Sequence, residues 1–209
     1  MAPNLASLVR LMLVTDDAFV AGRDLVALAQ AAVRGGVTAV QLRLKHASGR
    51  VRVEAARALV AAVPVPLLVN DRLDVALAAG AAGVHLGPDD LPVVLARRVV
   101  PPGFVVGASV GSADEAQVAR PADYWGVGPW RASGTKPAAG EALGAGGFRR
   151  IVALAGRIPC IAIGGVRPED ASAVRAAGGV GMAVVSGILG GGDVEQAARE
   201  YWSRVNSEQ

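Results

Sequence analysis

TAVQLRLK, residues 38–45, is a short apolar run that ends with polar and apolar side chains in alternation. Such a run is typical of a strand in a parallel sheet that is buried on both faces. The alternation places Gln41, Arg43 and Lys45 on one face of this strand and Leu42 and Leu44 on the other. Similar runs recur along the whole chain, with segments of helical periodicity between them. The stretch is therefore one unit of a repeated strand–helix pattern.

The repeat predicts eight strands and eight helices. The strands are expected at residues 8–15, 38–45, 66–70, 83–87, 104–110, 123–130, 159–165 and 181–188. The helices are expected around residues 25–32, 47–62, 73–79, 91–98, 113–119, 148–156, 168–176 and 194–205, with Ser112 and Asp170 as start signals for two of them. This order favours a single α/β domain over residues 1–209, a (β/α)8 TIM barrel. An open doubly wound sheet is the alternative, because eight repeats do not by themselves require closure.

Composition and charge argue against several classes of protein. The 209 residues carry a formal net charge of +3 without a basic cluster that includes aromatic side chains, so no nucleic-acid partner is expected. Cys160 is the sole cysteine, which rules out an internal disulfide and fits a reducing compartment. Neither a signal-peptide pattern nor a membrane-spanning apolar run is found, so we expect a cytoplasmic protein without membrane partners. The oligomeric state, a homo-oligomer included, stays open.

The polar face of the 38–45 strand predicts an anion site. Leu42 and Leu44 would pack against helices, so Gln41, Arg43 and Lys45 would point into the barrel. Two cations inside a barrel are costly unless an anion meets them, and a di- or polyphosphate is a natural partner. An internal salt-bridge network with Asp or Glu is the alternative.

Lysine is rare in this chain. Of the 21 Lys and Arg residues, only Lys45 and Lys136 are lysines, so a general surface role explains them poorly. Lysine offers a compact ammonium on a flexible stem, unlike the planar fork of arginine. We therefore expect both lysines in the active site, with chance survival as the alternative.

Carboxylates after two neighbouring strands predict a Mg²⁺ site. Asp71 follows Asn70 at the end of the third strand, and Asp90 follows the fourth. Adjacent strands are about 4.8 Å apart, so both carboxylates can reach one cation. Oxygen ligands suit Mg²⁺, which takes further ligands from water and substrate phosphate. The alternative is that each aspartate caps the helix that follows it.

The seventh and eighth strands predict a second phosphate site. Loops after these strands form the usual phosphate pocket of this barrel, and glycines allow close approach of backbone N–H groups. The residues concerned are Gly165 at the end of the seventh strand and Val185 and Ser186 in the eighth. The loop after the sixth strand, with Ser133, Gly134, Thr135 and Lys136, predicts a phosphate clamp. Glycines that only relieve crowding are the alternative. Ser109, at the end of the fifth strand, either binds phosphate or begins a turn, and His85 is expected to be a hydrogen-bonded barrel residue.

These motifs together resemble the thiamine phosphate synthase family. They are QLRLK 41–45, NDR 70–72, GVHLG 83–87 with Asp90, the Thr135-Lys136 loop, IGG 163–165 and VVS 184–186. Each is weak alone, but they occur in family order over nearly the whole chain. The resemblance implies a Mg²⁺-dependent transferase of thiamine biosynthesis. It would join 4-amino-2-methyl-5-(diphosphooxymethyl)pyrimidine to a thiazole (carboxy)ethyl phosphate, forming thiamine phosphate and releasing diphosphate.

The resemblance also implies a role for each site residue. Pyrimidine diphosphate would be bound by Gln41, Leu42, Arg43, Leu44, Lys45, Asn70, Ser109 and Lys136. Thiazole phosphate would be bound by Ser133, Gly134, Thr135, Gly165, Val185 and Ser186, and the metal by Asp71 and Asp90. The chain departs from the family at Ser133, usually Thr, at Leu44, often Glu, and at Arg131-Ala132, usually Phe-Pro.

Three other functions remain as alternatives. A thiazole tautomerase on the same barrel is expected to carry a His where this chain has Gly111. A Schiff-base aldolase would need a desolvated lysine on a strand. A phosphate-ligand sensor would bind the thiazole phosphate without turnover.

Overall fold

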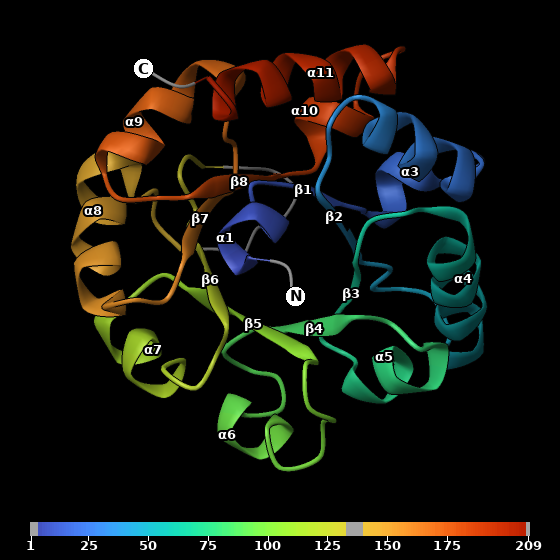
Figure 1. Cartoon of the computed structure of the whole chain (residues 1–209), viewed down its shortest axis with the longest axis horizontal. Helices are drawn as coiled ribbons and strands as arrows, with labels where there is room; N and C mark the ends of the chain where they lie inside the picture. Colours follow the sequence, from blue (N-terminus) through green and yellow to red (C-terminus); the bar gives the residue numbers. More distant parts are fainter. Residues whose placement is uncertain (1–3, 133–139, 208–209) are drawn as a thin grey trace.

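The computed structural model describes residues 4–132 and 140–207. Eight parallel strands close into a barrel in the order β1 to β8, and helices surround it (Figure 1). The strands are β1 (Leu11–Val14), β2 (Ala39–Leu42), β3 (Leu67–Asn70), β4 (Gly83–Leu86), β5 (Val105–Val110), β6 (Tyr124–Val127), β7 (Cys160–Ile163) and β8 (Gly181–Val184). The predicted TIM barrel is confirmed, and the open-sheet alternative is wrong because β1 pairs with β8.

The helices follow the strands in chain order. They are α1 (Leu5–Leu8), α2 (Asp17–Val20), α3 (Leu25–Arg34), α4 (Gly49–Ala62), α5 (Leu73–Ala79), α6 (Val93–Ala96), α7 (Ala113–Val118), α8 (Gly144–Ala155), α9 (Ala171–Ala176) with the preceding 3-10 turn η1 (Pro168–Asp170), α10 (Ser186–Leu189) and α11 (Val194–Val205). None of those in the described part of the chain is long and apolar enough to cross a membrane.

Side-chain caps determine where several helices begin. Asp24 accepts hydrogen bonds from the backbone N–H groups of Val26 and Ala27 at the start of α3, and Ser48 caps α4 in the same way. Ser112 caps α7, as the sequence predicted. These bonds satisfy N–H groups that have no partner within the helix. Asp170 makes no such bond at the start of α9, but its carboxylate accepts from the Arg167 N–H in the capping box of η1, where the predicted helix begins.

The apolar core has two parts, one inside the barrel and one between the barrel and the helices. The inner part includes Met12, Leu68, Tyr124 and Ile161, which come from strands around the barrel. Leu42 belongs to the outer part. This division follows from the alternation of side chains along each strand.

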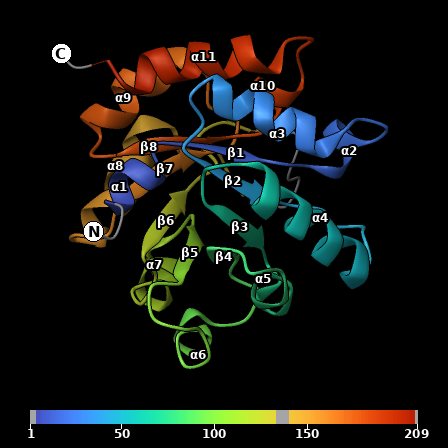
Figure 2. The same cartoon turned by 45° about the vertical axis from the view of Figure 1, so that its right-hand side comes forward.

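Helix α1 closes the N-terminal end of the barrel. It lies across the barrel centre in Figure 1, and Figure 2 shows α1 and α2 at opposite ends of β1. Leu8 is buried against the inner core, and its carbonyl accepts a 2.8 Å hydrogen bond from the Thr38 hydroxyl. The other end of the barrel, where the strands finish, therefore carries the accessible rim.

Several boundaries differ from the prediction, and β2 ends at Leu42 instead of residue 45. Residues 5–8 form α1, so β1 begins at Leu11 instead of residue 8. Helix α8 begins at Gly144 instead of residue 148. Strand β8 ends at Val184, and Ser186 begins α10. The prediction extended this strand to residue 188 because the β-branched run 184–185 carries no signal for the helix that follows.

Candidate active site

The predicted site residues in the described part of the chain lie at one rim of the barrel. Because all eight strands are parallel, their C-terminal ends meet there. Arg43 and Lys45 follow β2, Asp71 follows β3, and Asp90 follows β4, while Asn70 and Ser109 are in β3 and β5; Gly165 follows β7, and Val185 and Ser186 follow β8. Ser133, Gly134, Thr135 and Lys136 lie outside the described residues.

The alternation predicted for β2 is confirmed within the strand. Gln41 is buried inside the barrel, where its amide N–H donates to the Met12 sulfur at 3.4 Å. Leu42 faces the outer core, so a ligand contact from this residue would have to come from its main chain. Beyond the strand, the Arg43 backbone N–H donates to the Thr15 hydroxyl at 2.8 Å.

The two cations after β2 differ in their partners. Arg43 forms a hydrogen-bonded ion pair with Asp16, and only 13% of each side chain is exposed. This pair matches the salt-bridge alternative for Arg43. Lys45 is more open, at 43% exposure, and its ammonium nitrogen lies 3.6 Å from an Asp71 carboxylate oxygen. Lys45 therefore remains accessible to an anion at the rim.

The turn between β1 and α2 holds this segment in place, which the sequence analysis missed. Asp16 pairs with Arg43, and the Asp17 carboxylate accepts hydrogen bonds from the backbone N–H groups of Lys45 at 2.7 Å and His46 at 3.3 Å. The acidic pair follows directly after Thr15, at the end of β1. Their position directly after a predicted strand was the sequence signal that could have placed them at the rim.

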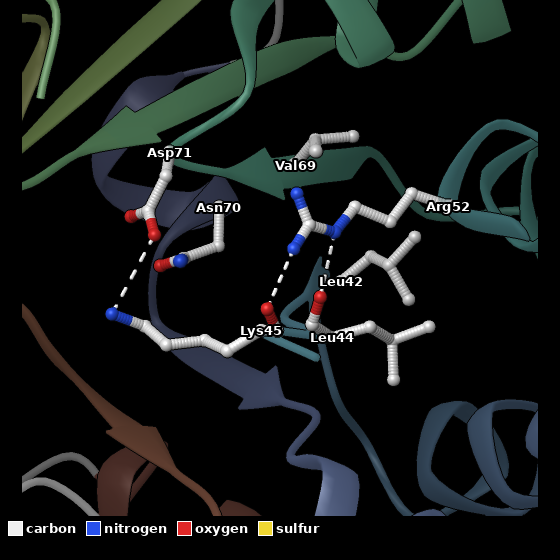
Figure 3. A pocket seen from close by; sticks show the side chains of 7 residues that line it. All are labelled: Leu42, Leu44, Lys45, Arg52, Val69, Asn70 and Asp71. Atoms are coloured by element: carbon white, nitrogen blue, oxygen red, sulfur yellow. Dashed lines mark hydrogen bonds and ion pairs between the residues drawn. The ribbon is translucent and has the colours of Figure 1, made fainter. Parts of the chain in front are cut away.

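Arg52 of α4 fastens the same segment from the other side (Figure 3). Its guanidinium donates to the carbonyl oxygens of Leu44 and Lys45, both at 2.7 Å. A pocket lies here between the ends of β2 and β3, lined by Leu42, Leu44, Lys45, Arg52, Val69, Asn70 and Asp71. In Figure 3 the Lys45 ammonium and the Asp71 carboxylate point toward each other across one side of this pocket.

Asp71 and Asp90 form a carboxylate pair at the ends of β3 and β4. Burial raises the pKa of Asp71, and the neighbouring Asp90 raises it further, whereas Lys45 and Arg43 oppose the shift. Asp90 accepts a 2.6 Å hydrogen bond from the Gly87 N–H. Neither aspartate caps a helix, since the N-cap residues of α5 and α6 are Arg72 and Pro92 and neither helix has a side-chain cap.

This pair is suited to a divalent cation. Two carboxylates held together repel each other, and a cation between them removes that cost. The described residues contain no cluster of three or more His, Cys, Asp or Glu side chains that could hold a metal alone. Water and substrate oxygens would therefore complete the coordination, as is usual for Mg²⁺.

Ser109 is fixed by a hydrogen bond inside the barrel. Its hydroxyl lies 3.0 Å from Nε2 of His85, whose Nδ1 lies 2.8 Å from the Tyr124 hydroxyl. His85 is thus a hydrogen-bonded barrel residue, as predicted. Ser109 belongs to β5 and does not begin a turn. Tyr124, at the start of β6, was missed because its run reads as a simple apolar strand.

The loops after β6 and β7 are joined by an ion pair. Arg131 makes two hydrogen bonds to the Asp170 carboxylate, which is 8% exposed. Arg131 also donates to the Gly165 carbonyl at 3.2 Å. Gly165 has φ +66°, a left-handed conformation that favours glycine. The residue that departs from the family pattern at position 131 therefore supports the predicted thiazole phosphate loop.

A closed barrel with a lysine, a carboxylate pair and a half-buried serine at its C-terminal rim is a TIM-barrel enzyme for anionic, phosphorylated small molecules. Residues 11–188 match the sequence profile of the family described as thiamine monophosphate synthase. The chain belongs to this family.

Close relatives carry the same description. The chain is 48% identical over 197 residues to the thiamine-phosphate synthase of Azorhizobium caulinodans, covering 90% of this chain and 91% of that protein. It is 50% identical over 200 residues to that of Xanthobacter autotrophicus, covering 93% and 94%. A solved structure of thiamine phosphate pyrophosphorylase from Pyrococcus furiosus superposes with a TM-score of 0.86 at 35% identity, covering 97% and 98% of the two chains.

Proposed function

We propose that this chain is a thiamine-phosphate synthase, a transferase of thiamine biosynthesis. It joins 4-amino-2-methyl-5-(diphosphooxymethyl)pyrimidine to a thiazole (carboxy)ethyl phosphate and releases diphosphate. The observation that carries the proposal is the meeting of Lys45 with the Asp71–Asp90 pair at the rim. A cation next to two carboxylates suits a metal-bound diphosphate, and the relatives described above carry this activity in their names.

The pyrimidine diphosphate would lie over the ends of β2, β3 and β5. Lys45 and Arg43 supply positive charge, Asn70 and Ser109 supply hydrogen bonds, and Lys136 would approach from its loop. Gln41, buried below them, would meet the pyrimidine end, and the main chain of residues 42–44 would border the site. The Arg52 and Asp17 contacts hold that main chain in place.

The thiazole phosphate would lie over the ends of β7 and β8. Gly165, Val185 and Ser186 would approach it with backbone N–H groups and a hydroxyl. Ser133, Gly134 and Thr135, with their two hydroxyls, would close on it from the loop after β6. The two sites share one rim, so the thiazole nitrogen and the pyrimidine methylene carbon can be brought together.

The chemistry needs no nucleophile from the protein. The bond between the methylene carbon and the diphosphate oxygen breaks, and its electron pair leaves with the diphosphate. The pyrimidine ring stabilises the cation that remains, and the lone pair of the thiazole nitrogen then forms the new carbon–nitrogen bond. Arg43, Lys45 and Lys136 stabilise the charge that develops on the leaving diphosphate. The remaining site residues position both substrates and exclude water.

Asp71 and Asp90 would hold Mg²⁺, with water and diphosphate oxygens as the other ligands. When bound, the ion supplies further positive charge for the leaving diphosphate. The cytoplasm, as a reducing compartment, stays the predicted location.

A coupled synthesis assay tests the proposal. Purified chain is incubated with both substrates, with Mg²⁺ or with EDTA, and thiamine phosphate and diphosphate are measured. We expect both products in equal amounts with Mg²⁺ and neither with EDTA. If no thiamine phosphate forms with Mg²⁺, the proposal fails.

The same assay separates the alternatives. A tautomerase would convert the thiazole phosphate without consuming the pyrimidine. A Schiff-base aldolase would be trapped covalently by borohydride with a carbonyl substrate, and a sensor would bind without any product. None of the described residues favours these functions, and Gly111 stands after β5 where the tautomerase would carry His.

A further inference from the structure

A chain of hydrogen-bonding side chains crosses the barrel interior from Tyr124 to the rim. Tyr124 of β6 is completely buried, and His85 of β4 is 4% exposed. The Tyr124 hydroxyl lies 2.8 Å from His85 Nδ1, and His85 Nε2 lies 3.0 Å from the Ser109 hydroxyl. This row of hydrogen bonds therefore joins three strands, β6, β4 and β5, and ends at a side chain of the proposed diphosphate site.

Two glycines make room in the barrel for these hydrogen-bonded side chains. A Cβ atom at Gly107 would lie 2.3 Å from the Tyr124 ring, and one at Gly126 would lie 3.1 Å from the His85 ring. The first approach is far below van der Waals contact. Both strands therefore lack a side chain at the positions where the aromatic and imidazole rings lie.

The distances favour one direction for these hydrogen bonds. The Tyr124 hydroxyl has one hydrogen to donate, and two acceptors lie within its reach. His85 Nδ1 lies at 2.8 Å, whereas the Met12 sulfur, a weak acceptor, lies at 3.9 Å. Tyr124 therefore donates to Nδ1. A neutral imidazole has one acceptor and one donor, so Nε2 carries the hydrogen and donates to Ser109.

This direction decides what Ser109 offers at the rim. A serine hydroxyl has one hydrogen and two lone pairs. Because one lone pair of Ser109 accepts from His85, the hydrogen is left to point away from the imidazole, toward the site. A donor suits an anionic phosphate oxygen, whereas the opposite direction would present only lone pairs and repel it.

We propose that His85 and Tyr124 are positioning residues that hold the Ser109 hydroxyl as a hydrogen-bond donor to the diphosphate. This inference rests on the proposed function for the role of Ser109 as a diphosphate ligand. In this proposal Tyr124 and His85 act through Ser109.

The tautomer of His85 tests the direction without any assay of activity. The chain has two histidines, so ¹⁵N NMR of histidine-labelled protein gives two sets of ring signals, and His46→Gln assigns them. We expect His85 as the neutral Nε2–H tautomer in the wild type. An Nδ1–H tautomer, or an imidazolium at neutral pH, would overturn the proposal.

Binding of inorganic diphosphate with Mg²⁺, measured by calorimetry, tests the action through Ser109. Tyr124→Phe keeps the ring and removes the donor, and we expect about tenfold weaker binding. Ser109→Ala should weaken binding at least as much. In the Ser109→Ala background, Tyr124→Phe should change binding by less than about twofold, because its effect passes through the missing hydroxyl.

Tyr201→Phe is the matched control. It removes the only other tyrosine hydroxyl, which donates to the Val166 carbonyl and not to His85 or Ser109. Diphosphate binding should therefore stay as in the wild type. Equal effects of Tyr124→Phe with and without Ser109, or no effect in either, contradict the positioning role.

The outcomes also separate this inference from the proposed function. A wild type that binds diphosphate with the expected coupling and tautomer but makes no thiamine phosphate would sink the function alone. A wild type that makes thiamine phosphate with uncoupled variants would sink the positioning role alone.

Discussion

Asp71 has a backbone conformation that few residues tolerate. Its φ is +63°, in the left-handed region, where Asp and Asn are the side chains most often found after Gly. Its N–H donates to the His85 carbonyl at 2.8 Å, so the neighbouring strand β4 holds the turn. The turn places the carboxylate next to Asp90 and Lys45. This local strain is thus linked to the proposed metal site.

Asp71→Asn should separate charge from structure at this position. Asparagine tolerates the same backbone, and loss of a carboxylate whose pKa is raised beside Asp90 removes repulsion, so the melting temperature should not fall. Turnover at fixed Mg²⁺ should drop on the order of 100-fold. Asp74→Asn, an exposed aspartate in the next turn, is the control and should keep wild-type turnover. Unchanged turnover in Asp71→Asn would contradict the metal role.

The two lysines are expected to act at different stages. Lys45 follows a strand and is held by the Asp17 and Arg52 contacts, so it should bind diphosphate in the ground state. Lys136, outside the described residues, is predicted to reach the diphosphate as it departs. Lys45→Ala should therefore raise KM for the pyrimidine diphosphate, whereas Lys136→Ala should mainly lower kcat. Steady-state kinetics of both variants decide this, and the reverse pattern would contradict the distinction.

At the scale of elements, the ion pair between Arg131 and Asp170 connects two loops of the rim. Burial alone would raise the pKa of Asp170, but hydrogen bonds from Arg131 and from the Arg167 N–H leave it below the usual value. A lowered folded pKa means that the ionised form stabilises the fold. This stabilisation is complete well above pH 3.8 and is lost as the pH falls below that value.

Asp170→Asn should therefore destabilise the fold at pH 7 but much less in acid. Breaking a pair with one buried partner should cost about 1–3 kcal/mol, reduced because Arg131 is 40% exposed. Urea denaturation at pH 7 and pH 3 measures the difference. Glu169→Gln removes a neighbouring exposed pair and should have no measurable effect. A loss of stability independent of pH would contradict the assigned pKa direction.

The sequence predicted the long helices and missed three of the four described helices that have only four residues, since α6 lies within the helix expected at 91–98. Helices α5 and α11 begin and end as expected, because seven or more residues carry a clear apolar pattern. Helices α1, α2 and α10 have four residues each and were missed or placed in strands. A single turn carries too little periodicity to separate it from its neighbours. Its position depends on contacts with distant residues instead.

The candidate site shows the same limit. Alternation along β2 correctly predicted a buried Gln41, because that pattern is local. The Arg43–Asp16 and Arg131–Asp170 pairs join residues 27 and 39 positions apart, and only the closed barrel brings them together. The hydrogen bonds that join Ser109 to His85 and Tyr124 could not be predicted from the sequence for the same reason, since these residues are also far apart along the chain.

At the scale of the whole molecule, the single thiol reports on the opening of the barrel. Cys160 of β7 is 1% exposed, and burial raises the pKa of its thiol to about 12. The reactive thiolate is therefore nearly absent in the folded chain at neutral pH. Labelling by a thiol reagent should require unfolding of the barrel wall.

We expect native protein to react with Ellman's reagent only as fast as it unfolds, and Mg²⁺ with diphosphate to slow the reaction further. Urea-denatured protein, the control, should react at once with one equivalent per chain. Rapid labelling of native protein would show that β7 opens locally.

Helix α1 has a consequence for traffic through the enzyme. It closes one end of the barrel, and side chains fill the interior next to it, so small molecules enter and leave at the C-terminal rim. Two substrates and two products must share that rim. A molecule seated nearer the barrel axis has to arrive before, and depart after, the one that covers it. Product-inhibition patterns should therefore follow an ordered sequence of binding and release, whereas a random sequence would mean that the two seats open independently.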